Sequence, residues 1–491
     1  MAYNTTEGLY IGKPEAEAET VGENALFQQY FQDFLHIETH VRNGSFIITG
    51  RKGAGKSAYA VQLKEQAKQS ETMFCEMVKK DEFDLEAAMQ SLQTMPSLAG
   101  EELKYEALFE WIILTRMVRM ILECKQGAYI PEVRALREFY RKNAGIVSIN
   151  QYVVAEVLAN KEVNFSPLKK EFGFISRVLG TKSIKAPFYQ MIVPLRDTLR
   201  KVLSMDIYGG YKFYVLFDDL DVKFKLYNEV DQNMLMDLVR IVRRYNTEYF
   251  SASPLHILVF MRDDIAKRLS GVDCDKNKIF GSYEYCINWY EHDMVQKNEK
   301  LILLRQFLNR RLNVAFRQNG MSYNTSDPWL TLVGENAIDG KTPFKYILDY
   351  TFYLPRDIIS IFKDMGNKRY KLPLSRDNID RLLKDFSKSK KEEISDELTA
   401  LYQKSEIDAL FESLREISSG WNVTYDGVLQ ILQSHNLSVT DFQNLIDYDL
   451  LVPVDQNNHL FFRYREQEFR GNYQDCTFRV PNILSLYLRN S

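Results

Sequence analysis

Eight consecutive residues, from Gly50 to Ser57, carry side chains at a spacing suited to binding a polyphosphate. They fit the pattern G-x-x-x-x-G-K-[ST] at every fixed position. Glycines let backbone N–H groups close around phosphate oxygens, and a helix that begins at the loop adds the positive end of its dipole. We expect Lys56 to reach the terminal phosphates and the Ser57 hydroxyl to hold Mg²⁺. The pattern therefore predicts a nucleotide site made of Gly50, Arg51, Lys52, Gly53, Ala54, Gly55, Lys56, Ser57 and Ala58.

The segments on either side of this loop favour a strand and a helix. Residues 45–49 are an apolar, β-branched run typical of a buried strand, and residues 58–66 place apolar side chains at helical spacing. A strand, a glycine-rich loop and a helix in this order are the context that the pattern requires. The alternative is a chance match of the pattern, and the flanking segments argue against it.

A second apolar segment, residues 213–217, ends at two aspartates. Ligands of parallel α/β sheets bind outside the carboxyl ends of the strands, so Asp218 and Asp219 are expected near the loop. We predict that Asp218 holds the metal and that Asp219 is catalytic because it polarises the attacking water. Asp221 is either a third acid or, more simply, a helix N-cap. A buried strand that ends in a polar turn is the structural alternative.

Two arginines follow further apolar segments. Residues 255–261 predict a third strand, after which Arg262 would face the terminal phosphate and act as a catalytic sensor of its hydrolysis. A structural ion pair with Asp263 or another neighbour is the alternative for Arg262. Arg356 follows a proline in the first turn of a predicted helix and is a second candidate to contact the nucleotide.

Taken in order, these segments resemble the P-loop ATPases of the STAND and wider AAA+ type, and in particular a prokaryotic, origin-recognition-like branch. The resemblance rests on GRKGAGKS, VLFDDLD, VFMRDDI and LPRDII, within residues 40–365. It implies ATP and Mg²⁺ as cofactors, Asp218 and Asp219 as the acidic pair, Arg262 as the sensor on the strand and Arg356 as the sensor of a lid. The family usually carries Asp-Glu where this chain has Asp-Asp. Members of the family also carry an arginine finger. In this chain Arg243, Arg244 and Arg268 are candidates for it, and nothing in the sequence favours one of them.

The expected fold is an α/β P-loop NTPase core, a parallel sheet flanked by helices, with a long helical insert, an α-helical lid and a C-terminal winged-helix-like domain. Residues 101–124 and 298–316 predict long helices, residues 387–393 a charged linker, and Asn457-Asn458 the turn of a hairpin. We place the boundaries as follows: an N-terminal segment at 1–40, the core at 41–295 with the insert at about 100–205, the lid at 296–400 and the winged-helix-like domain at 401–491.

The insert is strongly basic, although the 491 residues together have a formal net charge of −3. Residues 116–201 contain 16 Lys and Arg against 7 Asp and Glu, with aromatic residues between them, as in surfaces that bind nucleic acid. The alternatives are a surface for an acidic protein and a helical insert whose aromatic residues form its core. The C-terminal segment 440–451 carries three aspartates and no Lys or Arg, so we expect it to contact protein rather than DNA.

The composition indicates a globular cytoplasmic protein. Hydrophobic residues make up 45% of the chain and charged residues 26%, and no apolar stretch is long enough to span a membrane. The first residues have no basic and apolar regions typical of a signal peptide. The five cysteines lack C-x-x-C spacing, which fits a reducing compartment and predicts no zinc framework.

The leading hypothesis is an ATP-binding and ATP-hydrolysing switch that couples its nucleotide state to a partner or to self-assembly. No effector motif is visible, so the partner would be a separate effector or regulatory protein, and the resemblance places such proteins in bacterial antiviral defence. One alternative is a DNA-binding ATPase of initiator or loader type that uses the basic insert. Another is a nucleotide-gated scaffold with little hydrolysis, which would fit the Asp-Asp pair.

Overall fold

A computed structural model of the chain describes twelve stretches of sequence that form two compact units. The sheet unit comprises His36–Arg51 and Lys56–Ile287, and the helical unit comprises Met1–Leu35, Lys52–Gly55 and Asn288–Ser491. Asp221 and much of the middle of the insert lie outside the described residues. The described residues are 4–22, 26–79, 101–144, 162–179, 182–220, 229–270, 274–290, 298–399, 401–420, 423–465, 469 and 471–489.

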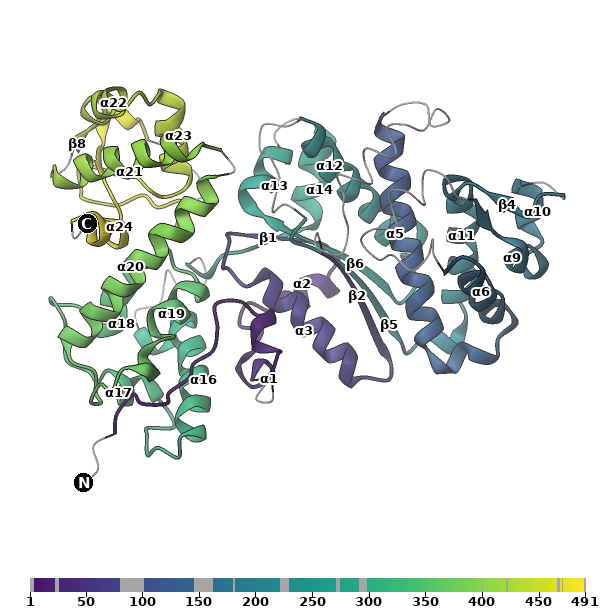
Figure 1. Cartoon of the computed structure of the whole chain (residues 1–491), viewed down its shortest axis with the longest axis horizontal. Coiled ribbons are helices and arrows are strands. Elements are labelled where there is room, and N and C mark those ends of the chain that lie inside the picture. Colours follow the sequence, from purple (N-terminus) through teal and green to yellow (C-terminus); the bar gives the residue numbers. More distant parts are fainter. Residues whose placement is uncertain are drawn as a thin grey trace. The chain divides into compact units, whose positions relative to one another are not determined.

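A five-stranded sheet, in which every neighbouring pair is parallel, forms the centre of the sheet unit (Figure 1). Its strand order is β2-β5-β6-β1-β7. The three strands expected from the sequence are present, and the third lies between the other two. The bounds are β1 Ile47–Gly50, β2 Met73–Lys79, β5 Lys212–Asp218, β6 Leu255–Arg262 and β7 Glu284–Ile287.

The strands β2 and β7 were not predicted, because each carries a glutamate within a short apolar run. Glu76 in β2 accepts a hydrogen bond from Arg116 at 3.0 Å, and Glu284 in β7 accepts one from Thr49. Both carboxylates are thus paired inside the fold, as buried charges must be. Reading only the hydrophobic pattern of the sequence does not reveal such partners.

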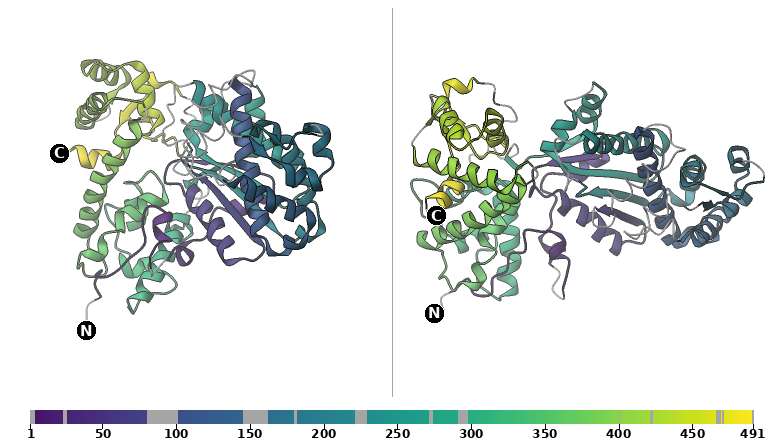
Figure 2. Two further views of the ribbon diagram at one scale, coloured as in Figure 1. Left: turned by 45° about the vertical axis from the view of Figure 1, so that its right-hand side comes forward. Right: turned by 45° about the horizontal axis from the view of Figure 1, so that its top comes forward.

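Helices cover both faces of this sheet (Figures 1 and 2). The helix after the glycine loop, α3, lies on one face, and α5, α12, α13 and α14 lie on the other. Strands that are covered on both faces usually have continuous apolar sequences, because their side chains are buried on both sides. In agreement with this, Ile47, Ile48 and Val215 are fully buried. The bounds are α2 Ile37–Arg42, α3 Lys56–Gln69, α5 Glu101–Glu123, α12 Glu229–Arg244, α13 Asp263–Ser270 and α14 Cys274–Tyr283.

The basic insert belongs to the sheet unit. Its first helix, α5, confirms the long helix expected over residues 101–124 and packs on both α12 and β5. The remaining insert elements lie on the side of α5 away from the sheet (Figure 1). They are α6 Pro131–Lys142, β3 Val163–Asn164, α9 Ser166–Glu171, α10 Phe174–Leu179, β4 Lys185–Ala186 and α11 Phe188–Leu203.

The helical unit consists mainly of α-helices and has a small three-stranded sheet in its C-terminal module, residues 404–488. The helix expected at 298–316 begins at Leu303. The module has the element order α21-β8-α22-α23-β9-β10, with an antiparallel sheet β8-β10-β9. The bounds are α1 Phe27–Tyr30, α16 Leu303–Gln318, α17 Pro328–Leu332, α18 Pro343–Leu348, α19 Pro355–Phe362, α20 Arg376–Leu398, α21 Lys404–Ser419, β8 Val423–Thr424, α22 Tyr425–Ser434, α23 Val439–Asp447, β9 Val452–Val454, β10 Thr477–Arg479 and α24 Asn482–Leu488.

Of two local predictions in the helical unit, one needs correction. The prediction of a linker at residues 387–393 is wrong, because this stretch lies in the middle of α20 and Lys390 is buried. Lys390 donates to Asp357 at 2.9 Å, and this partner explains how a lysine-rich run lies within a packed helix. The hairpin expected at Asn457-Asn458 is present but short. The N–H of Asp455 donates to the carbonyl of His459 at 3.1 Å, the N–H of Phe461 donates to the carbonyl of Pro453 at 3.0 Å, and Val454 forms a bridge with Leu460, whereas the longer pairing of β9 is with β10.

A buried ion pair fixes the N-terminal segment to α16. The guanidinium of Arg311 donates to Glu19 at 2.6 Å and to the carbonyl of Ile11 at 2.8 Å. Glu19 also accepts from the backbone of Lys13 at 2.7 Å. Gly12 has a φ of +106°, and a Cβ there would lie about 2 Å from both charged side chains. The segment 9–19 is therefore an integral part of the helical unit. In the part of the chain that the structure describes, no helix is both long enough and apolar enough to cross a membrane.

Removing one partner of this buried pair is expected to be costly. Glu19→Ala leaves the Arg311 charge buried and unpaired, which typically costs about 3–5 kcal/mol of unfolding free energy. Urea denaturation followed by circular dichroism measures the loss. Glu15→Ala, which removes an exposed carboxylate of the same segment, serves as the control. A Glu19→Ala protein as stable as the control would contradict this role of the pair.

Candidate functional site

The glycine loop begins at the carboxyl end of β1 and ends where α3 begins. Gly53 and Gly55 have φ angles of +85° and +105°, in the left-handed backbone region that residues other than glycine rarely adopt. A Cβ at Gly53 would also lie 2.9 Å from the Cβ of Arg356. Both glycines are thus required for the turn, and Gly53 is also required for this close approach, as expected of a loop whose backbone surrounds a ligand.

Lys56 lies across the base of the loop. Its Nζ donates to the carbonyl of Gly50 at 2.8 Å and to the carbonyl of Arg51 at 3.1 Å. An ammonium group has three donors on a flexible stem, so these carbonyls can be exchanged for phosphate oxygens without moving the helix. The role of Lys56 in contacting phosphates stays a prediction.

The acidic pair lies at the end of β5, two strands from the loop. The strand β6 lies between β5 and β1, and its Val259 aligns with both Phe217 and Ile47. Neighbouring strands are about 4.8 Å apart, so the end of β5 and the start of the loop lie within about 10 Å laterally. Asp218 follows Phe217 directly and is 1% exposed.

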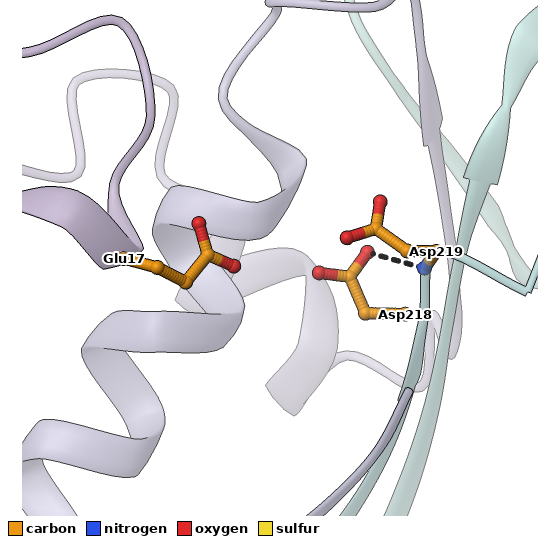
Figure 3. Close-up of side chains that lie close together, drawn as sticks. All are labelled: Glu17, Asp218 and Asp219. Carbon is orange, nitrogen blue, oxygen red and sulfur yellow. Dashed lines mark hydrogen bonds between the residues drawn. The ribbon is translucent and has the colours of Figure 1, made fainter. Parts of the chain in front are cut away.

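Asp218 is the most perturbed carboxyl group of the site. Burial and the adjacent Asp219 raise the pKa of Asp218 to about 7, against the opposing effects of the Ser57 hydroxyl, Lys79 and Lys56. Its Oδ1 accepts a hydrogen bond from the backbone N–H of Asp219 at 3.1 Å (Figure 3). The other oxygen, Oδ2, is buried and has no hydrogen-bond partner among the described residues. The carboxylate therefore needs positive charge that the protein supplies only in part.

These residues fit a magnesium ion. Mg²⁺ prefers oxygen ligands, keeps several waters and is usually held by one or two protein groups together with phosphate oxygens. The buried oxygen of Asp218, with the Ser57 hydroxyl near the same carboxylate, provides such a donor set. When bound there, the ion would neutralise charge on the phosphates.

Asp219 occupies an unusual backbone conformation. Its φ of +57° lies in the left-handed region, which Asp and Asn adopt more readily than other non-glycine residues. Its carboxylate points to the same side of the strand end as that of Asp218 (Figure 3), is about half exposed and lies 3.8 Å from Nζ of Lys79. Glu17, drawn in the same figure, belongs to the helical unit. Non-glycine residues in this region often mark functional sites.

Arg262 ends β6, directly beside the start of the loop. It aligns with Gly50 in the register of β1 and β6. Its guanidinium makes a bidentate pair with Asp264, through Nε at 3.0 Å and Nη2 at 2.7 Å. A bidentate pair is geometrically specific, so Asp264 holds the guanidinium in place and would compete with a phosphate for it. The predicted sensor role of Arg262 therefore remains a prediction.

The tip of the loop is held by residues of the helical unit. Lys52 Nζ lies 3.3 Å from Oε1 of Glu397, and the Ala54 carbonyl accepts from the indole N–H of Trp289 at 2.9 Å. Trp289 is buried against Phe34 and Phe307. Sequence reasoning missed Trp289 and Glu397, because neither belongs to a recognisable motif.

Arg356 packs on Gly53 at this tip. Its Nη1 donates to Glu393 at 3.2 Å, whereas its Nε is buried and has no partner among the described residues. Burial acts to raise the pKa of Glu393, but Lys390 and Arg356 outweigh it and lower that pKa to about 2. Arg356 thus combines an unused buried donor with a carboxylate partner that stays ionised. Both features suit a side chain that exchanges one anion for another.

The structure brings the predicted site residues together in two groups. Lys56, Ser57 and Asp218 interact within the sheet unit, and Arg356 lies against Gly53 within the helical unit. Of the finger candidates, Arg244 pairs with Glu106 at 2.9 Å and so has a structural partner.

Residues 303–395 match the family model described as the FunZ-associated C-terminal helical domain. This segment covers α16 to α19 and most of α20, including Arg356 and Glu393. No curated protein matches the chain. Among solved structures, the structure of the Aeropyrum pernix ORC1 protein in complex with DNA is similar over 95% of this chain and 96% of that chain, with 10% identity and a TM-score of 0.33. At this TM-score the similarity does not establish a shared fold.

The site predicts a specific effect of removing Lys56. Lys56→Ala should weaken the binding of a fluorescent ATP analogue by about tenfold or more, because it removes the charge closest to the phosphates. Lys68→Ala removes an exposed lysine of the same helix and should bind as the unmodified protein does. Equal affinity of Lys56→Ala and Lys68→Ala would place the nucleotide elsewhere.

Proposed function

We propose that this protein is a Mg²⁺-dependent ATP-binding and ATP-hydrolysing switch. The observation that carries the proposal is the grouping of Lys56, Ser57 and the under-satisfied Asp218 around a glycine loop between a parallel strand and a helix. Backbone N–H groups of the loop would bind the phosphates, Lys56 would reach the terminal ones, and Asp218 with Ser57 would hold the ion. The resemblance noted in the sequence favours ATP over other nucleotides.

Hydrolysis would depend on Asp219 and Arg262. Asp219 is half exposed at the end of β5, where its carboxylate can orient a water and accept its proton. Arg262, released from Asp264, would stabilise negative charge as it moves from the terminal phosphate. Asp264 would compete with the phosphate for Arg262, which fits slow or conditional turnover.

Coupling to the rest of the molecule would pass through the loop tip. Glu393 and Glu397, one turn apart on α20, pair with the two cations of the tip, Arg356 and Lys52. A nucleotide bound to the loop offers phosphate oxygens to the same cations and so competes with these carboxylates. We propose that this exchange changes the contacts of α20 and is the signal of the switch.

The readout would lie in the C-terminal module, which we interpret as a winged helix because of its element order. Its helix α23 carries two aspartates and no basic residue, which favours a protein partner or a second copy of the chain. A role in bacterial antiviral defence, in the cytoplasm, rests on the sequence resemblance alone. A nucleotide-gated scaffold differs from this proposal only in lacking hydrolysis.

Steady-state ATP hydrolysis separates the enzyme from the scaffold. Asp219→Asn should lower turnover by about 10²-fold and leave ATP binding unchanged, because asparagine tolerates the same backbone conformation and cannot accept the proton. Unmodified protein that binds ATP but shows no turnover above the Lys56→Ala control would support the scaffold instead.

The exchange at the loop tip makes a separate prediction. Glu397→Gln removes a competitor of the phosphates for Lys52 and should tighten ATP-analogue binding by about three- to tenfold, that is by about 1 kcal/mol. Glu392→Gln, at an exposed position of the same helix, should have no effect. If Glu397→Gln binds the analogue no more tightly than Glu392→Gln, the carboxylate does not compete with the nucleotide.

A further inference from the structure

The outer part of the insert contains a small core of its own. In this part the aromatic residues that alternate with basic ones in the sequence are mostly inside, with Phe139, Phe165, Phe172 and Phe188 at most 2% exposed. They pack among α6, α9, α10 and α11 and cannot stack on bases. The structure thus supports the alternative in which these aromatic residues form the core of the insert. Any contact with nucleic acid would then depend on the charged side chains.

The basic residues of the insert fall into two classes. Arg116 and Arg196 are buried or nearly buried and pair with Glu76 at 3.0 Å and Glu110 at 3.3 Å. These charges are structural and contribute little to the surface. Eight further basic residues of the insert are exposed or half-exposed, and they lie on three segments.

The first segment is the helix α6. Its Val133, Leu136 and Phe139 face the core, and Arg134, Arg137 and Arg141 face solvent at spacings of three and four residues. A helix rises about 1.5 Å per residue, so these arginines extend over about 10 Å. Glu138 lies on the same face and pairs with Arg141 at 3.0 Å.

Side-chain contacts join this helix to the other two segments. Lys142 at the end of α6 donates to Ser166 at the start of α9 at 3.2 Å. Lys169 in α9 donates to the carbonyl of Ser183 at 2.8 Å. The buried Asn143 donates to the carbonyl of Asn164 at 2.8 Å and thereby fixes α6 to β3, whose partner β4 follows Ser183. Residues 131–142, 166–171 and 182–186 therefore form one continuous surface, the basic face.

The basic face has the charge and composition of a polyanion site. The three segments carry eight basic residues against three acidic ones. Ile184 is the one large apolar side chain that is strongly exposed on them. Protein interfaces usually depend on a cluster of buried aromatic or apolar anchors, which this face lacks. Regularly spaced arginines suit phosphate groups, to which guanidinium groups bind in bidentate geometry.

We propose that the basic face binds the phosphate backbone of double-stranded nucleic acid without reading its sequence. With Phe139 in the core and Tyr140 only half-exposed on its three segments, the face lacks the row of exposed aromatic side chains that single-strand binders use. Contacts to phosphates alone carry no sequence information and release counterions, so binding weakens steeply with salt. This surface is separate from the glycine loop, and the proposal does not rest on the proposed nucleotide function.

Fluorescence anisotropy with labelled duplexes of two unrelated sequences tests this directly in the full chain. Replacing Arg134, Arg137 and Arg141 together by Gln should weaken binding about tenfold or more at moderate salt. It should also reduce the slope of log affinity against log salt by about 2.7, or about 0.9 per lost charge. A second variant, with Lys170, Lys182 and Lys185 replaced by Gln, should act in the same direction and guards against misfolding of the first.

The matched control replaces Arg42, Lys68 and Lys212, three exposed cations elsewhere in the sheet unit, by Gln and should bind as the unmodified protein does. Lys56→Ala should also retain duplex binding. Absence of duplex binding at low salt, or face variants that bind like the control, would overturn the proposal. Tighter binding of single strands, or of poly-glutamate at equal charge, would also overturn it and would point to stacking or to an acidic protein.

Discussion

The proposed function depends on one short loop, residues 50–57, whose base and tip are held by different groups. Its base, at Gly50, Arg51 and Lys56, is grouped with the parallel sheet, whereas its tip, Lys52–Gly55, is grouped with the helical unit. The loop can be a ligand site because its glycines adopt backbone conformations closed to other residues. The tip is held by two ion pairs, Lys52 with Glu397 and Arg356 with Glu393, and by the indole N–H of Trp289. In the proposed switch the two carboxylates compete with phosphate for the cations.

Ion pairs with different burial have different roles in this molecule. Pairs such as Arg311 with Glu19 and Arg116 with Glu76 are largely removed from water and fix elements in place. The pair of Lys52 with Glu397 is more exposed, contributes little to stability and is therefore easily exchanged. Arginines on the solvent side of α6 are exposed and suited to an external polyanion. Burial, more than charge count, separates these roles.

The sequence predicts the strands around the glycine loop better than the partners of the loop. The loop, the strand ending at Asp218 and the strand ending at Arg262 could be predicted, because apolar runs that end in polar residues are local signals. The partners at the loop tip, Trp289, Glu393 and Glu397, could not, because their contacts with Ala54, Arg356 and Lys52 depend on tertiary packing. The prediction of a linker at 387–393 was wrong for the same reason, since charge composition does not reveal a buried partner such as Asp357.

The most direct test of the central claim is hydrogen–deuterium exchange with and without a non-hydrolysable ATP analogue and Mg²⁺. We predict protection of residues 50–57 together with a change in exchange at the C-terminal end of α20, around Glu393 and Glu397. Both effects should be absent in Lys56→Ala. Protection of the loop without any change in α20 would contradict the claim that the loop tip transmits the nucleotide state.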